Sequence, residues 1–303
     1  MKIFPTIDLV KYVGQDRFFV DLWMNCPSKC SYCYIPDTKP SIKDEIKRIE
    51  HCKDVLFSHP DFKKGKNGSL ISLSPHAEPF SSVSRSKAIF RLIQEISIFD
   101  NPIQLATKAK LDRWDIKHLN KIRKYDTQIL AFISIATISN NSQYEWGTSQ
   151  PKERFENIRL LDNDSIPSCL FIKPVLPQIT ILDIDLFVEL CLKYEVKVTC
   201  VGVLYANIKV LSKMTFLNGL PKTEDLKPPG AKPNEYFHIN NDQEINMIYD
   251  RLKNETNSQV FKSAPCVIAW YFNTYSPTLT WKRFPQLCVH CKDCEQLYLT
   301  NNI

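Results

Sequence analysis

The segment "RFFVDLWMNCPSKCSYCYIP", residues 17–36, joins an apolar run to three closely spaced cysteines. Its first eight residues, 17–24, are mostly aromatic and aliphatic, which predicts a strand covered on both faces. Cys26, Cys30 and Cys33 follow with the spacing C-x3-C-x2-C. Thiols clustered at the end of a strand predict a metal site, with a disulfide knot or neighbouring core residues as alternatives.

Composition limits the class of protein. The chain has 303 residues, of which 44% are hydrophobic and 24% charged, as in a soluble α/β protein with a small appendage or in two ordinary domains. No apolar run is long enough for a transmembrane helix, and the first residues lack a signal region, so we expect a cytoplasmic protein without a membrane partner. A reducing cytosol disfavours disulfides among the eleven cysteines. The net charge of +6 permits an anionic substrate or nucleic acid without requiring either.

Apolar runs alternate with helical patterns through most of the chain. Their order predicts a repeated β-α unit and a parallel sheet, either open and doubly wound or closed into a partial barrel. In both arrangements ligands gather at the carboxyl ends of the strands. The predicted strands are 17–24, 69–75, 103–109, 129–137, 168–176 and 197–205, and the predicted helices are 41–57, 83–98, 112–124, 152–162 and 182–194.

A proline-rich stretch interrupts this pattern. Residues 220–235, "LPKTEDLKPPGAKPNE", contain four prolines and a glycine, which indicate a linker. The sequence therefore predicts a barrel-forming region over 1–219, a linker over 220–240, and a C-terminal helix with a cysteine-rich region over 241–303.

The cysteines of the first loop suit an iron–sulfur cluster, because such clusters are normally held by cysteine thiolates. A 4Fe–4S cluster has four irons to ligate, and the next cysteine after Cys33 is Cys52, far along the chain. One iron would therefore stay open to an outside ligand, as in catalytic metal sites. Zinc is the alternative, although its sites usually have four protein ligands in paired C-x2-C units.

This spacing after the first strand resembles the radical SAM superfamily. The resemblance implies a partial (β/α)6 TIM-type barrel and identifies Cys26, Cys30 and Cys33 as the catalytic cluster ligands. In that superfamily the open iron binds the amino and carboxylate groups of S-adenosylmethionine (SAM). The reduced cluster then cleaves SAM to methionine and a 5′-deoxyadenosyl radical. The aromatic residue before the third cysteine, here Tyr32, lies near the adenine in that family.

The order of later motifs resembles the spore photoproduct lyase-like branch over about residues 17–180. These motifs are "SLSPHAEPF" (72–80), "LATKAKL" (105–111), "FISIAT" (132–137), "EWGTSQPKER" (145–154) and "KPVLPQIT" (173–180). The resemblance implies that Glu78 faces the methionine amino group, and Lys108 is a candidate for its carboxylate. The SAM-binding residues carried over are Tyr32, Ser74, Glu78, Lys108, Ser134, Glu145 and Arg154.

The chain departs from that branch at one point that concerns the substrate. The lyase has a hydrogen-donating cysteine close to its equivalent of Ser74, whereas this chain has no cysteine between 52 and 169. We therefore expect hydrogen abstraction from a peptide or small molecule. A nucleic-acid repair or modification enzyme, or a non-catalytic iron–sulfur or zinc protein, is the alternative. The resemblance also implies a reductase partner such as flavodoxin or ferredoxin.

A second group of cysteines occurs near the C-terminus. Cys288, Cys291 and Cys294 have the spacing C-x2-C-x2-C, which resembles part of a ferredoxin loop, and Cys266 precedes them. Four thiolates suffice for a second, auxiliary 4Fe–4S cluster. Zinc and plain thiols remain alternatives, since zinc accepts the same ligands.

Overall fold

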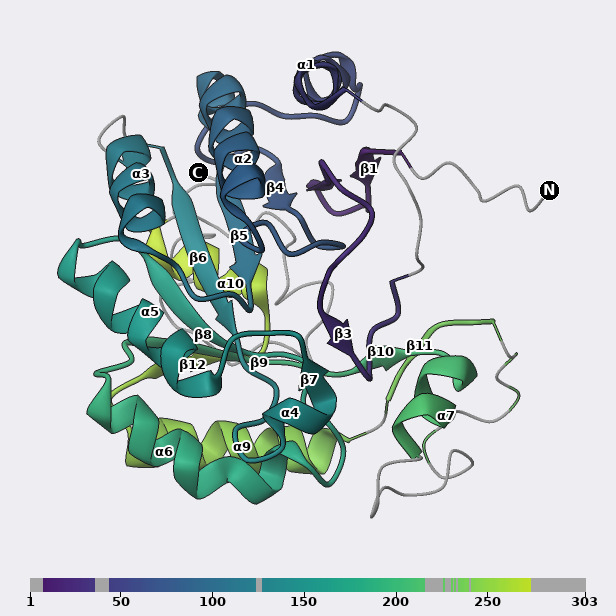
Figure 1. Ribbon diagram of the computed structural model, residues 1–303, viewed down its shortest axis with the longest axis vertical. Coiled ribbons are helices and arrows are strands. Elements are labelled where there is room, and N and C mark those ends of the chain that lie inside the picture. Colours follow the sequence, from purple (N-terminus) through teal and green to yellow (C-terminus); the bar gives the residue numbers. More distant parts are fainter. Residues whose placement is uncertain are drawn as a thin grey trace, which may run out of the picture.

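The computed structural model describes residues 8–35, 44–123, 127–215, 226, 230, 232, 234–239 and 241–273, and Figure 1 shows their arrangement. The centre is an eight-stranded sheet with the order β1-β2-β4-β5-β6-β8-β9-β12. Every neighbouring pair is parallel except β1 and β2. The strands are β1 (Val10–Tyr12), β2 (Arg17–Val20), β4 (Leu70–Leu73), β5 (Ile103–Thr107), β6 (Ile129–Ser134), β8 (Ser168–Ile172), β9 (Val198–Val201) and β12 (Gln259–Phe261).

The predicted α/β class is confirmed by this sheet, which is that of a partial TIM-type barrel. Strands β2, β4, β5, β6, β8 and β9 each lie within a predicted run, because continuous apolar segments mark strands covered on both faces. The sheet has two further strands, β1 and β12, that the sequence pattern did not predict. Because β12 pairs with β9, the chain beyond the proline-rich stretch adds a strand to the sheet.

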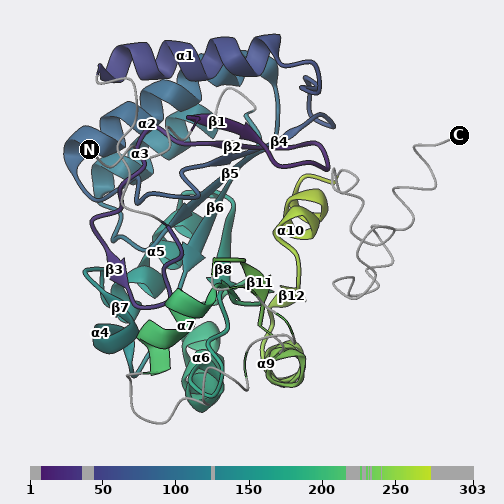
Figure 2. The ribbon, with the colours of Figure 1, turned by 90° about the vertical axis from the view of Figure 1, so that its right-hand side faces the viewer.

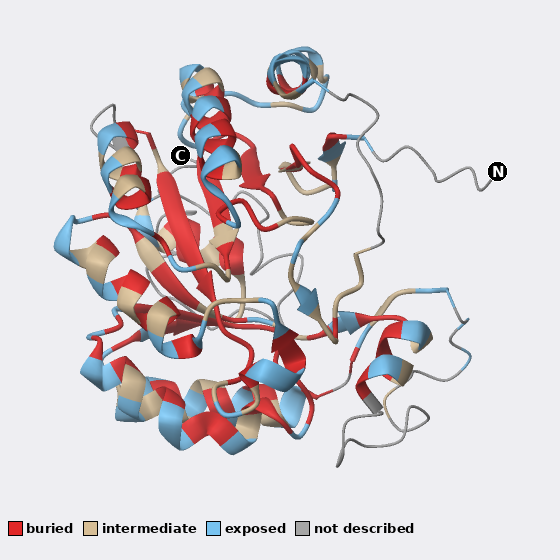
Figure 3. Ribbon diagram, viewed as in Figure 1, coloured by how far each residue is buried: buried red, intermediate tan, exposed pale blue. Residues whose placement is uncertain are grey.

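Helices cover the outer face of the sheet. They are α1 (Glu45–Ser58), α2 (Val83–Ile96), α3 (Arg113–Arg123), α5 (Pro151–Asn163), α6 (Ile184–Lys193) and α9 (Asp242–Glu255). Their apolar stripes pack on outward-facing strand residues such as Phe18, Ile71 and Ile133, all fully buried. Ser82 caps α2 by accepting from the Arg85 backbone N–H. Figure 3 shows this buried layer in red.

A last helix lies on the inner face instead. Helix α10 (Ala264–Tyr271) follows β12 and is on the opposite side of the sheet from α2 and α3 (Figure 2). Val267 and Ile268 pack there against Phe132 and Cys200 in a second apolar cluster. This helix covers part of the concave side with apolar residues. The polar side chains described below lie at the carboxyl ends of the strands instead.

Short elements connect these layers. Strand β3 (Lys29–Cys30) pairs with β7 (Glu145–Trp146), which follows the short helix α4 (Asn141–Tyr144). Strand β10 (Tyr205–Ala206) pairs with β11 (Phe237–His238), and α7 is Ile208–Thr215. Most of the predicted linker lies outside the described residues, so the domain boundaries stay a prediction. In the part of the chain with assigned helices, none has both the length and the apolar character needed to cross a membrane.

Candidate functional site

The three cysteines lie in one loop that begins where β2 ends. Cys30 belongs to β3 and pairs with Glu145, and the Cys33 N–H donates to the Cys30 carbonyl at 3.0 Å. All three thiols are free and half-buried. Burial is the main cause that raises the pKa of Cys30 to about 12; Glu145, Cys33 and Cys26 add to it and Lys108 opposes it, so the three thiols lie in one neighbourhood. A metal must displace these protons, since thiolates are the ligating form.

The donor set of this loop consists of three thiols, the ligand type by which iron–sulfur clusters are normally held. Within the described residues, no group of three or more His, Cys, Asp or Glu side chains is arranged to hold one metal ion. In an iron–sulfur cluster each cysteine binds a different iron, so its ligands surround the cluster instead of converging on a single point. Three thiols on one short loop, with no fourth cysteine of the described residues in that loop, fit a cluster with one open iron.

Glu145 is the centre of a buried ionic network beside this loop. Its Oε1 accepts from the Tyr32 hydroxyl at 2.5 Å and lies 3.0 Å from Lys108 Nζ. Its Oε2 accepts from the Arg154 guanidinium at 2.9 Å. Glu145 and Arg154 are both 0% exposed. Burial raises the pKa of Glu145, but the charges of Lys108 and Arg154 outweigh it and bring the pKa to about 2, so the carboxylate is ionised.

Ser134 links this network to the end of β6. Its hydroxyl accepts a hydrogen bond from Lys108 Nζ and donates to the Lys173 carbonyl at 3.3 Å. Its own carbonyl accepts from Arg154 at 2.5 Å. The structure thus brings together Tyr32, Lys108, Ser134, Glu145 and Arg154, which the sequence placed on four separate motifs.

Glu78 has partners of its own within the chain. Its carboxylate accepts from the Thr107 hydroxyl at 2.5 Å and from the backbone N–H groups of Lys108 at 2.7 Å and Phe80 at 3.2 Å. Burial raises its pKa, and these hydrogen bonds oppose that effect. Glu78 therefore fixes the backbone at the ends of β4 and β5, where Ser74 and Lys108 lie.

Ser74 differs from its neighbours because its hydroxyl is buried without a partner among the described residues. It follows β4 directly and has a φ of 53°, in the left-handed region. Backbone strain of this kind persists where the surrounding structure fixes it, and it is concentrated at ligand sites. A buried hydroxyl without a partner fits the polar groups of a nucleoside or amino-acid ligand at the carboxyl ends of the strands.

A set of polar residues next to the cysteine loop was not predictable from a sequence motif. Asp21 accepts from the His76 ring at 2.8 Å and from the His76 N–H at 3.1 Å. Tyr34 follows the third cysteine, and its ring centroid is 6.2 Å from His76 and 5.9 Å from Tyr236. Burial raises the pKa of Tyr34 to about 12. A single carboxylate or histidine in a strand-to-loop segment carries no spacing signal, which is why sequence reasoning did not select this group.

The second predicted metal group is only partly within the described residues. Cys266 lies on α10, half-buried beside the inner apolar cluster. Cys288, Cys291 and Cys294 lie outside the described residues.

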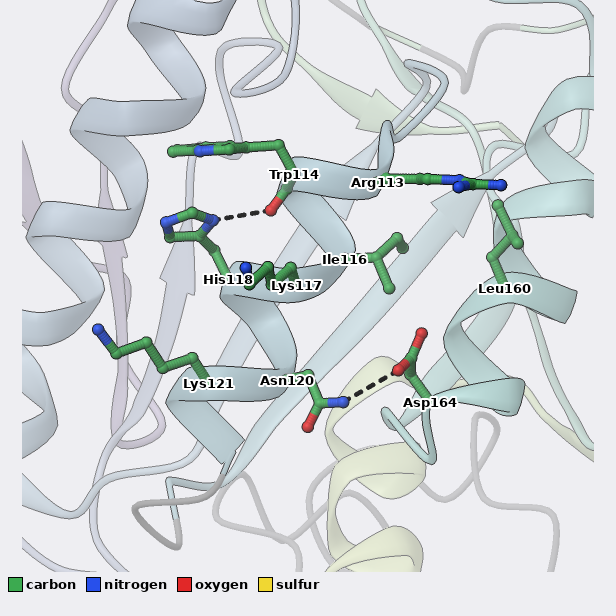
Figure 4. Close-up of a pocket in the computed structure, with 9 residues that line it drawn as sticks. All are labelled: Arg113, Trp114, Ile116, Lys117, His118, Asn120, Lys121, Leu160 and Asp164. Carbon is green, nitrogen blue, oxygen red and sulfur yellow. Dashed lines mark hydrogen bonds between the residues drawn. The ribbon is translucent and has the colours of Figure 1, made fainter.

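A surface pocket occurs away from this site, between α3 and α5 (Figure 4). Its lining residues are Arg113, Trp114, Ile116, Lys117, His118, Asn120, Lys121, Leu160 and Asp164. Across it, Asn120 donates to Asp164 at 3.0 Å. It contains none of the predicted site residues, so the candidate site rests on the cysteine loop and the Glu145 network.

The fold of this chain is similar to the folds of solved structures, whereas its sequence matches no family model. No protein-family model matches the chain, and no curated protein matches its sequence. A serine variant of spore photoproduct lyase superposes with a TM-score of 0.59 and 14% identity, over 86% of this chain and 79% of that one. Spore photoproduct lyase complexed with dinucleoside spore photoproduct superposes with a TM-score of 0.55 and 12% identity, over 78% of this chain and 74% of that one.

A peptide-bound enzyme structure is also similar. Streptococcus suis SuiB bound to precursor peptide SuiA superposes with a TM-score of 0.53 and 13% identity, over 84% of this chain and 50% of that one. The chain thus spans about half the length of SuiB. The spore photoproduct lyase match agrees with the branch that the sequence motifs resemble, and the chain has the α/β partial-barrel fold of these proteins.

Proposed function

We propose that this protein is a radical SAM enzyme. The observation that carries the proposal is the loop of three free, half-buried thiols at the end of β2. The Ser74 hydroxyl, which has no partner among the described residues, follows the neighbouring strand β4. Cys26, Cys30 and Cys33 would ligate a 4Fe–4S cluster. When bound, the cluster supplies an electron that divides SAM into methionine and a 5′-deoxyadenosyl radical able to abstract hydrogen from a substrate.

The protein residues would position SAM and exclude water from it. Ser74 offers a hydroxyl that is already desolvated, so a hydrogen bond to SAM costs no further burial. Lys108 offers a cation held at 3.0 Å from Glu145, which keeps its ammonium beside the cysteine loop. The Glu78 carboxylate already accepts three hydrogen bonds within the chain, so it could accept from the SAM amino group only in addition to these. We therefore assign Glu78 mainly to positioning Lys108.

The experiment uses the full chain, reconstituted anaerobically with iron and sulfide and reduced with dithionite. Incubation with SAM is expected to give 5′-deoxyadenosine and methionine in equal amounts, measured by mass spectrometry. Absence of 5′-deoxyadenosine from a reconstituted, reduced sample would reject the proposed function.

Replacing Ser74 by alanine separates binding from folding. The hydroxyl is buried and has no partner among the described residues, so its loss should not lower the free energy of unfolding of the apoprotein. Loss of a hydrogen bond to SAM should raise the KM for SAM by roughly tenfold, which corresponds to about 1.4 kcal/mol. Steady-state kinetics and chemical denaturation measure the two effects. A KM equal to that of the unmodified protein would remove Ser74 from the SAM site.

The second group of cysteines extends the proposal. We propose that Cys266, Cys288, Cys291 and Cys294 hold an auxiliary 4Fe–4S cluster, with structural zinc as the alternative. Anaerobic protein should then contain about eight iron and eight sulfide atoms per chain, since each cluster has four of each. Metal analysis that gives about four irons and one zinc per chain would support the zinc site and reject the second cluster.

The comparisons suggest candidates for the substrate without selecting one. SuiB was solved bound to a precursor peptide, and spore photoproduct lyase with a dinucleoside photoproduct. We favour a peptide or small molecule for this chain, because it lacks a cysteine between 52 and 169. A flavodoxin- or ferredoxin-like reductase would supply the electron.

A further inference from the structure

Two cations at the central sheet, one in β2 and one just after β8, have no acidic partner among the described residues. Arg17, at the start of β2, donates to the Ser72 hydroxyl at 2.9 Å and to the Gln104 side-chain carbonyl at 2.8 Å. Both partners are neutral. Burial lowers the pKa of the Arg17 guanidinium to about 10, which reflects the cost of holding this charge without an anion.

Lys173 is the second cation and directly follows β8. Its side chain is exposed, yet the surrounding protein lowers its pKa by desolvation. Within the described part of the chain, no carboxylate oxygen lies within 4.0 Å of its ammonium. The ammonium is therefore accessible to a ligand although protein atoms surround much of the side chain.

Gly202 makes room for this lysine. A Cβ at residue 202 would lie 2.6 Å from Lys173 Cδ and 3.0 Å from Lys173 Cγ, closer than atoms in contact can approach. The aliphatic part of Lys173 therefore runs across the end of β9, and a side chain at this position would push it away. Gly202 thus lets the Lys173 stem pass close to β9, and among the described residues Lys173 has no ion pair.

The two cations share one region next to the proposed SAM pocket. Each interacts electrostatically with the other and with the Cys200 thiol on β9. The Lys173 carbonyl accepts from Ser134, whose hydroxyl also contacts Lys108. Asp21, an acid on the same loop as the cysteines, is already paired with His76 at 2.8 Å. The region beside the SAM pocket is therefore positively charged.

We propose that Lys173 and Arg17 form an anion subsite that holds a carboxylate or phosphate group of the substrate. This inference rests on the proposed function, since it places the substrate beside the SAM pocket. Charge-assisted hydrogen bonds from an ammonium and a guanidinium are among the strong ones, and an incoming anion offsets the cost of the two desolvated cations. The substrate class is thereby narrowed to anionic molecules.

The test is acetylation footprinting of the reconstituted full chain with SAM and an oxidised cluster. Limited acetic anhydride is applied in chloride, phosphate or succinate at equal ionic strength, and the modification of each lysine is read by peptide mass spectrometry. At an anion concentration about ten times its dissociation constant, acetylation of Lys173 should slow about tenfold. Lys193, exposed on α6 at the outer face, is the matched control and should react equally in all three salts.

The arms of the experiment distinguish the possible outcomes. Protection by phosphate alone identifies a phosphate group, and protection by succinate alone a carboxylate. An equal rate at Lys173 in all three salts, or equal slowing at Lys193, overturns the subsite. Arg17→Gln should reduce the protection, and full protection in that variant would exclude Arg17. The readout needs no SAM cleavage, so its failure is distinct from failure of the proposed function.

Discussion

Replacement of Cys30 by alanine is expected to reduce formation of 5′-deoxyadenosine to the level of a sample without protein. Cys30 is one of only three thiols in the loop, and an iron–sulfur cluster that loses one of three cysteine ligands cannot keep its geometry. Iron content at the first site should fall in parallel, measured by the loss of the charge-transfer absorbance of the reconstituted protein.

The matched control is Cys52→Ala. Cys52 is a fully buried cysteine of α1 that packs in the outer core and is not one of the three loop thiols. Its loss should lower stability by about 1 kcal/mol, because a small cavity forms, and should leave SAM cleavage intact. If Cys30→Ala cleaved SAM as well as Cys52→Ala does, the loop would not hold the catalytic cluster.

Replacement of Glu145 by glutamine is expected to cause a large loss of stability. The substitution keeps the shape of the side chain but leaves the Arg154 guanidinium, which is 0% exposed, without its anion. Removing one partner of a buried pair typically costs about 3–5 kcal/mol. The free energy of unfolding of the apoprotein, from urea titration, measures the effect. Asp185→Asn is the control, because its pair with Arg251 is largely exposed and should contribute less than about 1 kcal/mol.

This loss should depend on pH in a defined direction. The pKa of Glu145 is lowered from 4.5 to about 2 in the folded chain, despite burial, by Lys108 and Arg154. A lowered carboxyl pKa stabilises the fold above the unfolded value and loses that contribution as the pH falls toward the folded value. The difference between the unmodified protein and Glu145→Gln should therefore be complete above pH 4.5 and shrink toward pH 2. A difference that stays constant across this range would contradict the ionic role of Glu145.

The sequence predicts those strands of the sheet that lie within long apolar runs, and it does not predict the short ones. Strands β2 to β9 of the sheet are four to six residues each and lie within continuous hydrophobic segments. Strands β1 and β12 have three residues each, which is too short for a pattern to appear. Their positions depend on pairing with distant strands, a property that local propensity does not contain.

The candidate site was predictable where its residues share a short motif. The cysteine spacing identified the loop, but the contact of Tyr32 with Glu145 joins residues 113 positions apart. It depends on the pairing of β3 with β7, two strands of two residues that no pattern indicates. Lys173 and Arg17 were missed for a related reason. An isolated lysine or arginine gives no sequence signal, and the interaction between these two exists only in the folded chain.

Electron–nuclear double resonance on the reduced, reconstituted protein is the most direct test of the central claim, that the three-cysteine loop leaves one iron open to SAM. With SAM labelled with nitrogen-15 at the methionine amino group, the account predicts a hyperfine coupling between that nitrogen and the reduced cluster. A reduced cluster that binds SAM, as judged by equilibrium dialysis, yet shows no such coupling would contradict it.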